Sequence, residues 1–167
     1  MALKGDRYEF ETTIDFFLNE VAERGGVVTI STAGSGAALD QSAALVTYAA
    51  AQSGLVPIGL LLNDMVNIDQ TRQHINFHKD ELQKGGKVSI LKKGWVVTNM
   101  ITGTPVAGAL AYLDDATAGN LTVKANVDDG EYIPIGRFMS TVDEDGYVKV
   151  EVNLPAGVMN TDAGALE

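Results

Sequence analysis

The sequence predicts a mainly β protein, an antiparallel β-sandwich or small barrel with an extended N-terminal arm and a long polar surface excursion. Three observations support this fold class. Residues 147–154 alternate apolar and polar side chains with period two, which is the pattern of a strand buried on one face. Short apolar runs with turn signals between them follow at near-regular spacing, as in sandwiches and barrels. The 18 glycines suit many tight turns better than long helices.

Residues 132–139 and 147–154 are expected to form an antiparallel hairpin. Asp145-Gly146 supplies its turn, because glycine accepts a positive φ and aspartate can bond its own backbone. The apolar pattern of the first strand changes parity at Gly136. A glycine at such a change is typical of a β-bulge, so we expect a bulge there.

The N-terminal segment is also predicted to be extended, because residues 8–18 alternate with period two. A helix over residues 15–24 that ends at Gly25-Gly26 is the alternative. An arm with this many aromatic side chains needs a surface to lie on, either its own core or a neighbouring chain, and it is long enough to reach from one subunit to the next. The candidate partner-contact residues are Arg7, Tyr8, Phe10, Phe16, Phe17 and Trp95.

Further strands are predicted between turn signals along the chain. They cover residues 27–31, 56–62, 87–91, 95–101, 107–113 and 121–127. The Lys-Lys-Gly of residues 92–94 is expected to be a turn between two of them. The Trp-Val-Val of residues 95–97 is apolar on both faces, so its strand is either central or covered by another subunit.

Residues 42–53 admit two interpretations. Their alanines, with Asp40 as a possible cap, favour a helix. The sequence Pro-Ile-Gly at residues 57–59 repeats at residues 134–136. If that repeat reflects an internal duplication, residues 45–50 form a strand instead.

Two stretches carry no strand pattern. Residues 33–38 are small and glycine-rich, which predicts a flexible loop or a segment that is ordered by a partner. Residues 64–81 are the most polar part of the chain and predict a long surface excursion that returns at Gly85-Gly86.

Length and charge limit the function classes. The 167 residues fit one domain with an arm, which we divide into an N-terminal arm (1–24), a β-rich domain (25–160) and a flexible C-terminal tail (161–167). Without cysteine the chain has neither a disulfide framework nor a thiolate metal site. The formal charge of -10 argues against nucleic acid and anionic membranes as partners. No apolar run approaches the roughly 18 residues of a spanning helix, and we expect no secretory signal.

Candidate reactive groups are few, and we expect no catalytic, cofactor-binding or metal-binding residue. His74 and His78 have the spacing of two zinc ligands on a helix, but two surface or interface histidines explain them better. The carboxylates of residues 143–145 could hold calcium, although acidic residues before a glycine are usually a solvated turn. Trp95 is expected to be a core or interface anchor rather than a sugar-stacking platform. The cluster Lys84, Lys87, Lys92 and Lys93 fits an acidic partner or a solvated hairpin edge equally well.

The chain also resembles a known family. Residues 134–139 and 145–150 look like the C-terminal end of tailed-bacteriophage head decoration (cement) proteins, and residues 103–120 show the same likeness. Residues 19–100 are similar to uncharacterised phage structural proteins. The resemblance implies a non-enzymatic, β-rich protein, made in the host cytoplasm, that binds the outer capsid surface of the virion. There it would clamp neighbouring major capsid subunits as a homo-oligomer, with a trimer favoured over a dimer. The polar stretch 64–81 departs from the family pattern and leaves the docking surface open.

Two other function classes remain as alternatives. One is a different virion component, such as a fibre-base or tail module. The other is a small ligand-binding β-barrel, which requires a concave pocket with convergent polar groups. The residues alone assemble no such pocket.

Overall fold

The computed structural model describes residues 2–33, 44–48, 57–64, 81–114, 116–123, 131–132, 134–154 and 159–160. Within these ranges every regular element is a β-strand and none is a helix. The predicted mainly β class is therefore confirmed. The part of the chain described here contains no helix that is long and apolar enough to cross a membrane.

Ten strands form one sheet in the order β1-β4-β3-β5-β7-β13-β12-β9-β10-β8, and two small sheets pair β2 with β6 and β11 with β14. The strands of the large sheet are β1 (Tyr8–Leu18), β3 (Val27–Ala33), β4 (Ala44–Tyr48), β5 (Pro57–Asp64), β7 (Lys87–Thr98), β8 (Ile101–Thr102), β9 (Leu110–Leu113), β10 (Leu121–Thr122), β12 (Pro134–Phe138) and β13 (Val148–Asn153). The small sheets hold β2 (Ala22–Glu23), β6 (Glu81–Leu82), β11 (Glu131–Tyr132) and β14 (Met159–Asn160). The large sheet is mixed and not purely antiparallel as predicted, because β1 runs parallel to β4 and β8 parallel to β10.

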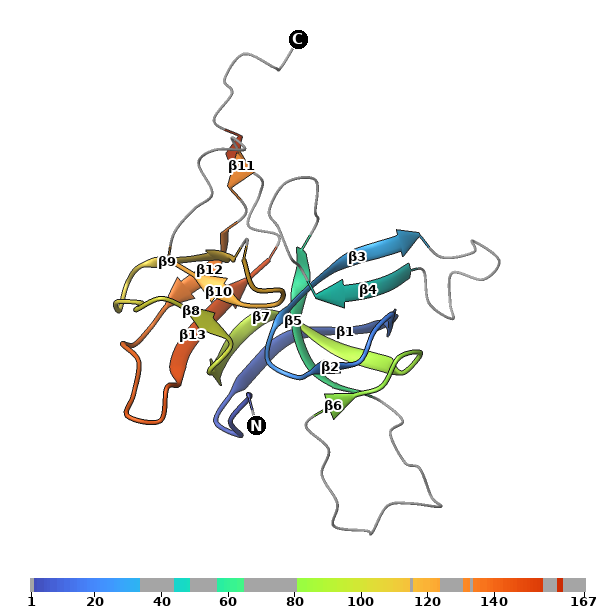
Figure 1. Ribbon diagram of the computed structural model, residues 1–167, viewed down its shortest axis with the longest axis horizontal. Coiled ribbons are helices and arrows are strands. Elements are labelled where there is room, and N and C mark those ends of the chain that lie inside the picture. Colours follow the sequence, from blue (N-terminus) through green and yellow to red (C-terminus); the bar gives the residue numbers. More distant parts are fainter. Residues whose placement is uncertain are drawn as a thin grey trace.

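Strand β7 connects the two halves of the molecule. Along one edge it pairs with β1; along the other it pairs first with β5 and then with β13. Figure 1 shows β5 and β7 in the middle of the view, with β8, β9, β10, β12 and β13 on one side and β3 and β4 on the other. Because β1 also pairs with β4, the strands β1, β4, β3, β5 and β7 form a closed ring of hydrogen-bonded neighbours.

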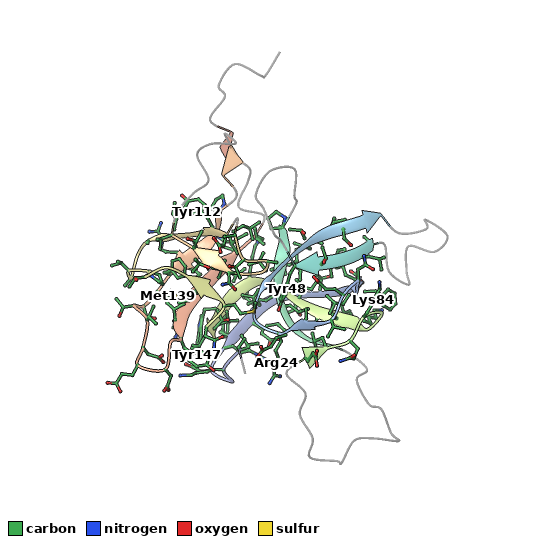
Figure 2. The ribbon with its side chains drawn as sticks, viewed as in Figure 1. Arg24, Tyr48, Lys84, Tyr112, Met139 and Tyr147 are labelled. Atoms are coloured by element: carbon green, nitrogen blue, oxygen red, sulfur yellow. The ribbon has the colours of Figure 1, made fainter. Side chains whose placement is uncertain are left out.

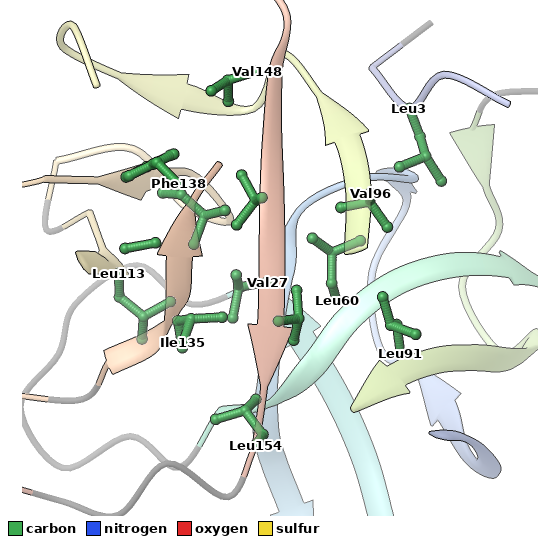
Figure 3. Packing of buried hydrophobic residues seen from close by; sticks show 14 of the residues in the cluster. Leu3, Val27, Leu60, Leu91, Val96, Leu113, Ile135, Phe138, Val148 and Leu154 are labelled. Atoms are coloured by element: carbon green, nitrogen blue, oxygen red, sulfur yellow. The ribbon is translucent and has the colours of Figure 1, made fainter. Parts of the chain in front are cut away.

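Two hydrophobic cores lie on the two sides of the central strands. The ring core takes its members from the five ring strands and from β2 and β6: Leu18, Ala22, Val28, Val46, Leu61, Leu82, Val88 and Ile90. The larger core gathers Leu3, Val27, Leu60, Leu62, Leu91, Val96, Ala111, Leu113, Leu121, Ile135, Phe138, Val148, Val150, Val152 and Leu154. Figure 3 shows this larger core around β13, with Ile135 on one side of the strand and Leu60 on the other.

The apolar run of β5 is explained by these two cores. In β5, Leu61 belongs to the ring core, whereas Leu60 and Leu62 belong to the larger core, and all three are fully buried. A strand covered on both faces loses the alternation of a half-exposed strand. The prediction that the strand at Trp95 is central or covered is confirmed in its first form, because β7 pairs along both edges. At residues 95–97 only Val96 is buried in a core, while Trp95 and Val97 are half-buried.

One predicted turn is wrong. Residues 92–94 were expected to separate two strands, but β7 runs without interruption through them. Lys92 and Lys93 both reach Glu11 on the neighbouring strand β1, at 3.1 and 3.5 Å. Gly94 has a φ of +146°, and a Cβ on it would lie 2.1 Å from the Tyr8 carbonyl oxygen. Gly94 therefore allows the backbone of β1 to approach β7 closely and does not mark a chain reversal.

The N-terminal segment is extended and lies on its own sheet. Residues 15–24 hold the end of β1 and the short β2, so the extended alternative is confirmed over the helix. Leu3 forms a β-bridge with Thr98, and the side chains of Leu3 and Leu18 are fully buried. Burying one such side chain contributes about 1.5–3 kcal/mol. Removing residues 1–18 would therefore take away a central pairing as well as two core side chains.

The C-terminal hairpin follows the prediction. The alternate residues of β13, Val148, Val150 and Val152, are buried. Gly146 has a φ of +84° and donates its N–H to the Asp143 carbonyl. The pairing of β12 with β9 shifts register between Pro134 and Gly136, which confirms the predicted bulge.

Several predictions fall wholly or mainly outside the described residues. These concern the glycine-rich loop near residues 33–38, the polar excursion 64–81 with both histidines, and the tail 161–167. Residues 44–48 of the ambiguous stretch form β4, which confirms a strand at that point.

We predict that Gly94→Ala lowers the free energy of unfolding by about 2–5 kcal/mol, because the added Cβ meets backbone and the φ is unfavourable. The matched control is Gly146→Ala, which has a positive φ but no atom within 4 Å of its Cβ, and should cost only about 1–2 kcal/mol. Chemical denaturation measures both. Equal losses in the two variants would contradict the close approach of β1 to β7.

Candidate functional site

A row of side chains crosses five strands on the face opposite the larger core. Trp95 of β7 lies between Tyr8 of β1 and Glu151 of β13, its opposite neighbours on the two adjacent strands. Arg137 of β12 continues the row, lying between Glu151 and Leu110 of β9. Residues directly opposite one another on neighbouring strands project from the same face. Each of the five is exposed or half-buried, so this row faces outward.

An aromatic groove of about 410 Å³ opens at one end of this row. We define it by Tyr8, Phe10, Trp95 and Met139, with Lys93, Glu151 and Asn153 completing its wall. The side chains of Tyr8, Phe10 and Met139 are 54%, 72% and 48% exposed. Large apolar side chains that gather at one exposed place usually mark an interaction site.

A second groove of about 210 Å³ lies on the other side of β13. Its lining includes Leu110, Pro134 and Arg137, and it shares Glu151 and Asn153 with the aromatic groove. The two grooves therefore flank one strand and form a continuous outward face across the sheet.

Trp95 is held in place from both directions. The Lys149 ammonium lies 3.3 Å from the centre of its ring, and Tyr8 is its neighbour on β1. Cation–π contacts of this kind contribute about 0.5–1 kcal/mol at exposed sites. The ring thus presents an ordered apolar surface to the groove.

The charges around the groove are mostly basic. Lys92 and Lys93 share the single carboxylate of Glu11, while Lys149 lies on Trp95. Arg137 donates from Nη1 to the Gly108 carbonyl. The ion pair of Arg7 with Glu9 at 2.6 Å is neutral overall.

The structure places the six predicted partner-contact residues in two groups. Tyr8, Phe10 and Trp95 come together at the aromatic groove, with Arg7 beside them in sequence and bonded to Glu9. Phe16 instead packs against the ring core, and Phe17 is half-buried opposite Lys87. Whether these residues contact a partner stays a prediction.

Sequence reasoning missed Met139, Glu151 and Asn153. Glu151 and Asn153 are the polar positions of the predicted strand 147–154, so their shared face was available from the alternation. Their meeting with Trp95 was not, because it depends on the pairing of β13 with β7.

The acidic turn at residues 143–145 has a structural explanation. Asp143 Oδ1 accepts hydrogen bonds from the N–H groups of Asp145 and Tyr147, and Oδ2 accepts one from Lys4 Nζ at 3.0 Å. Lys4 also lies 4.1 Å from the centre of the Tyr147 ring. Figure 2 shows Tyr147 toward the same end of the molecule as Met139. Among the described residues, no group of three or more His, Asp or Glu side chains could hold a metal ion.

Comparison with known proteins identifies the family. The family model described as structural cement protein (E217 gp24/Pam3 gp6) matches residues 5–153. The chain belongs to this family of phage structural cement proteins. A search of curated proteins found no match.

Family membership settles the general role. The cement protein is a structural, non-enzymatic component of the phage virion that is located on the capsid, binds capsid proteins and stabilises the capsid. The resemblance noted in the sequence is thereby confirmed.

The turn of the cement protein generates a pH prediction. The pKa of Asp143 is lowered, first by the hydrogen bond from the Tyr147 N–H and then by Lys4. A carboxylate with a lowered folded-state pKa stabilises the fold above its ordinary value of 3.8, and this contribution is lost as the pH falls through the lower folded-state pKa. We therefore expect Asp143→Asn to lower Tm slightly at pH 7, with a difference that shrinks below about pH 4.

Thermal unfolding of both proteins between pH 2.5 and pH 7 provides the measurement. A difference in Tm that stays constant over this range would show that the carboxylate charge is not involved. Asp6→Asn is the matched control, since Asp6 is exposed and lies in the same N-terminal segment as Lys4, the partner of Asp143.

Proposed function

We propose that the cement protein binds the outer surface of the capsid through the aromatic groove, with Tyr8, Phe10 and Trp95 contacting the major capsid protein. The observation that carries this proposal is the exposure of Tyr8, Phe10 and Met139 around an ordered tryptophan. Aromatic residues, Met and Arg are the side chains enriched at protein interfaces, and Trp and Tyr often dominate their binding energy.

The rigidity of the site supports adhesion further. Its side chains project from β1, β7 and β13, which are paired with one another along their lengths. A surface that is already ordered loses little conformational entropy on binding. Many copies on one shell then gain avidity, because neighbouring binding sites are fixed relative to each other.

We further infer that the finer fold is a small barrel, formed by the ring β1-β4-β3-β5-β7 around its core, joined to an open half that is antiparallel except for the parallel pair β8–β10. In this proposal residues 1–24 form the contact arm, which contributes its strand β1 to the barrel, and residues 25–160 form the rest of the decoration domain. Of the predicted partner-contact residues, Arg7 precedes the groove residue Tyr8, whereas Phe16 and Phe17 lie at the other end of β1. We propose these three as contacts of the arm outside the groove.

We also propose a homo-oligomer, with a trimer favoured over a dimer. Exposed apolar side chains outside the groove support a second contact surface, since Ile30 is 41% and Val106 is 61% exposed. Obligate contacts between copies would cover such residues.

We predict that the double variant Tyr8→Ala/Phe10→Ala loses at least about tenfold in affinity for empty capsids, because truncating aromatic hot spots costs about 2 kcal/mol or more. Co-sedimentation with capsids measures the affinity. Tm should change little, since both side chains are exposed. The matched control is Val21→Ala, which removes a 49% exposed apolar side chain that lies outside the groove, between β1 and β2. Undiminished binding of the double variant would refute the groove as the capsid contact.

For the oligomer, size-exclusion chromatography with light scattering should give three times the 17.7 kDa of the chain. Dilution should shift the mass toward the monomer. A monomeric mass at every concentration would refute the trimer and leave the groove proposal intact. Imaging of decorated particles would separate a position on the head from one on the tail.

A further inference from the structure

We propose that the occupant of the two grooves is an extended, acidic segment of the capsid subunit, with an apolar side chain in the aromatic groove and a carboxylate at Arg137. This inference rests on the proposed function, because it assumes that the outward face meets the capsid. It adds the chemistry of the partner, which neither the family nor the aromatic groove specifies.

Local charge is the first argument. Among the described residues, four basic side chains, Lys92, Lys93, Arg137 and Lys149, lie on or beside this face with the carboxylates of Glu11 and Glu151. The neighbouring Arg7–Glu9 ion pair adds no net charge. The whole chain carries a formal charge of -10. The face is therefore a positive region on an acidic protein. Complementary charge on a partner would favour encounter and orientation at this face over the rest of the surface.

The state of Trp95 is the second argument, and it concerns the aromatic groove. An aromatic ring attracts a cation through its negative face. The Lys149 ammonium already occupies this position on the Trp95 ring, 3.3 Å from its centre. A second lysine or arginine from a partner would be repelled by the Lys149 ammonium. An apolar side chain meets no such cost beside Tyr8, Phe10 and Met139.

Arg137 is the third argument, and it concerns the second groove. Its side chain is exposed, and Nη1 donates to the Gly108 carbonyl. A guanidinium carries five N–H donors in a planar fork, so this single bond leaves donors that match a carboxylate in bidentate geometry. Asn153 on the shared wall adds an amide donor.

The shape of the face is the fourth argument. The two grooves lie on either side of β13 and share Glu151 and Asn153, so one occupant can fill both. The row from Tyr8 to Leu110 crosses five strands, which are about 4.8 Å apart in a sheet. A shallow face of this length suits an extended segment better than a single inserted side chain.

Glu151 provides the decisive test, because its carboxylate lies between Trp95 and Arg137 and forms no ion pair among the described residues. Glu151→Gln removes this negative charge with almost no change in shape. An acidic occupant predicts tighter capsid binding, by about two- to fivefold. Arg137→Gln should weaken binding by about three- to tenfold, and both effects should diminish at high salt.

Lys84→Gln is the charge-matched control, because Lys84 lies at the opposite end of the molecule from Met139 (Figure 2). It should leave affinity unchanged, and Tm of all three variants should match the parent protein. Weaker binding of Glu151→Gln together with tighter binding of Arg137→Gln would mean a basic occupant and would overturn the inference. Unchanged affinity in both variants would overturn it as well.

These outcomes separate the inference from the function on which it rests. If Tyr8→Ala/Phe10→Ala weakens capsid binding but the charge variants behave oppositely, the groove remains the capsid contact and only the acidic occupant is refuted. If Arg137→Gln changes the mass measured by light scattering but not capsid affinity, the face contacts a second copy of this chain, and the inference is refuted.

Discussion

Pairing of β7 along both edges is the interaction on which the rest of the structure depends. One edge carries β1, and the other carries β5 and then β13, so a single strand belongs both to the closed ring and to the open half. The two cores lie on its opposite faces, with Ile90 in the ring core and Val96 in the larger core. Because backbone hydrogen bonds and apolar burial meet in the same residues, the halves are held as one sheet.

The same pairing builds the outward face. Gly94 lets the Tyr8 backbone approach β7 closely, which places the Tyr8 side chain next to Trp95. Lys92 and Lys93 both form ion pairs with Glu11 on β1. Stability and adhesion thus use one set of contacts, and the site needs no separate loop to hold it.

The outward face suits adhesion because of what its described residues offer. The Asp143 carboxylate of the acidic turn accepts hydrogen bonds from backbone N–H groups and from Lys4, and the histidines lie outside the described residues. The face presents an ordered apolar surface around Trp95, with lysine and arginine side chains at its edges. On a shell with many identical sites, a modest affinity at each site is enough, because the copies act together.

The sequence by itself determined the β class, the C-terminal hairpin with its bulge at Gly136, and the buried face of β13, because these follow from period-two alternation and turn chemistry within a few residues. It also named Tyr8, Phe10 and Trp95 as contact candidates, because an aromatic-rich arm needs a surface to lie on and Trp95 was expected to be a core or interface anchor, but it did not show that they meet. Only the tertiary structure decided that residues 92–94 continue a strand, that β1 lies on its own sheet, and that Glu151 stands between Trp95 and Arg137. Those features depend on the register between strands far apart in the chain, and local alternation carries no information about which strands pair.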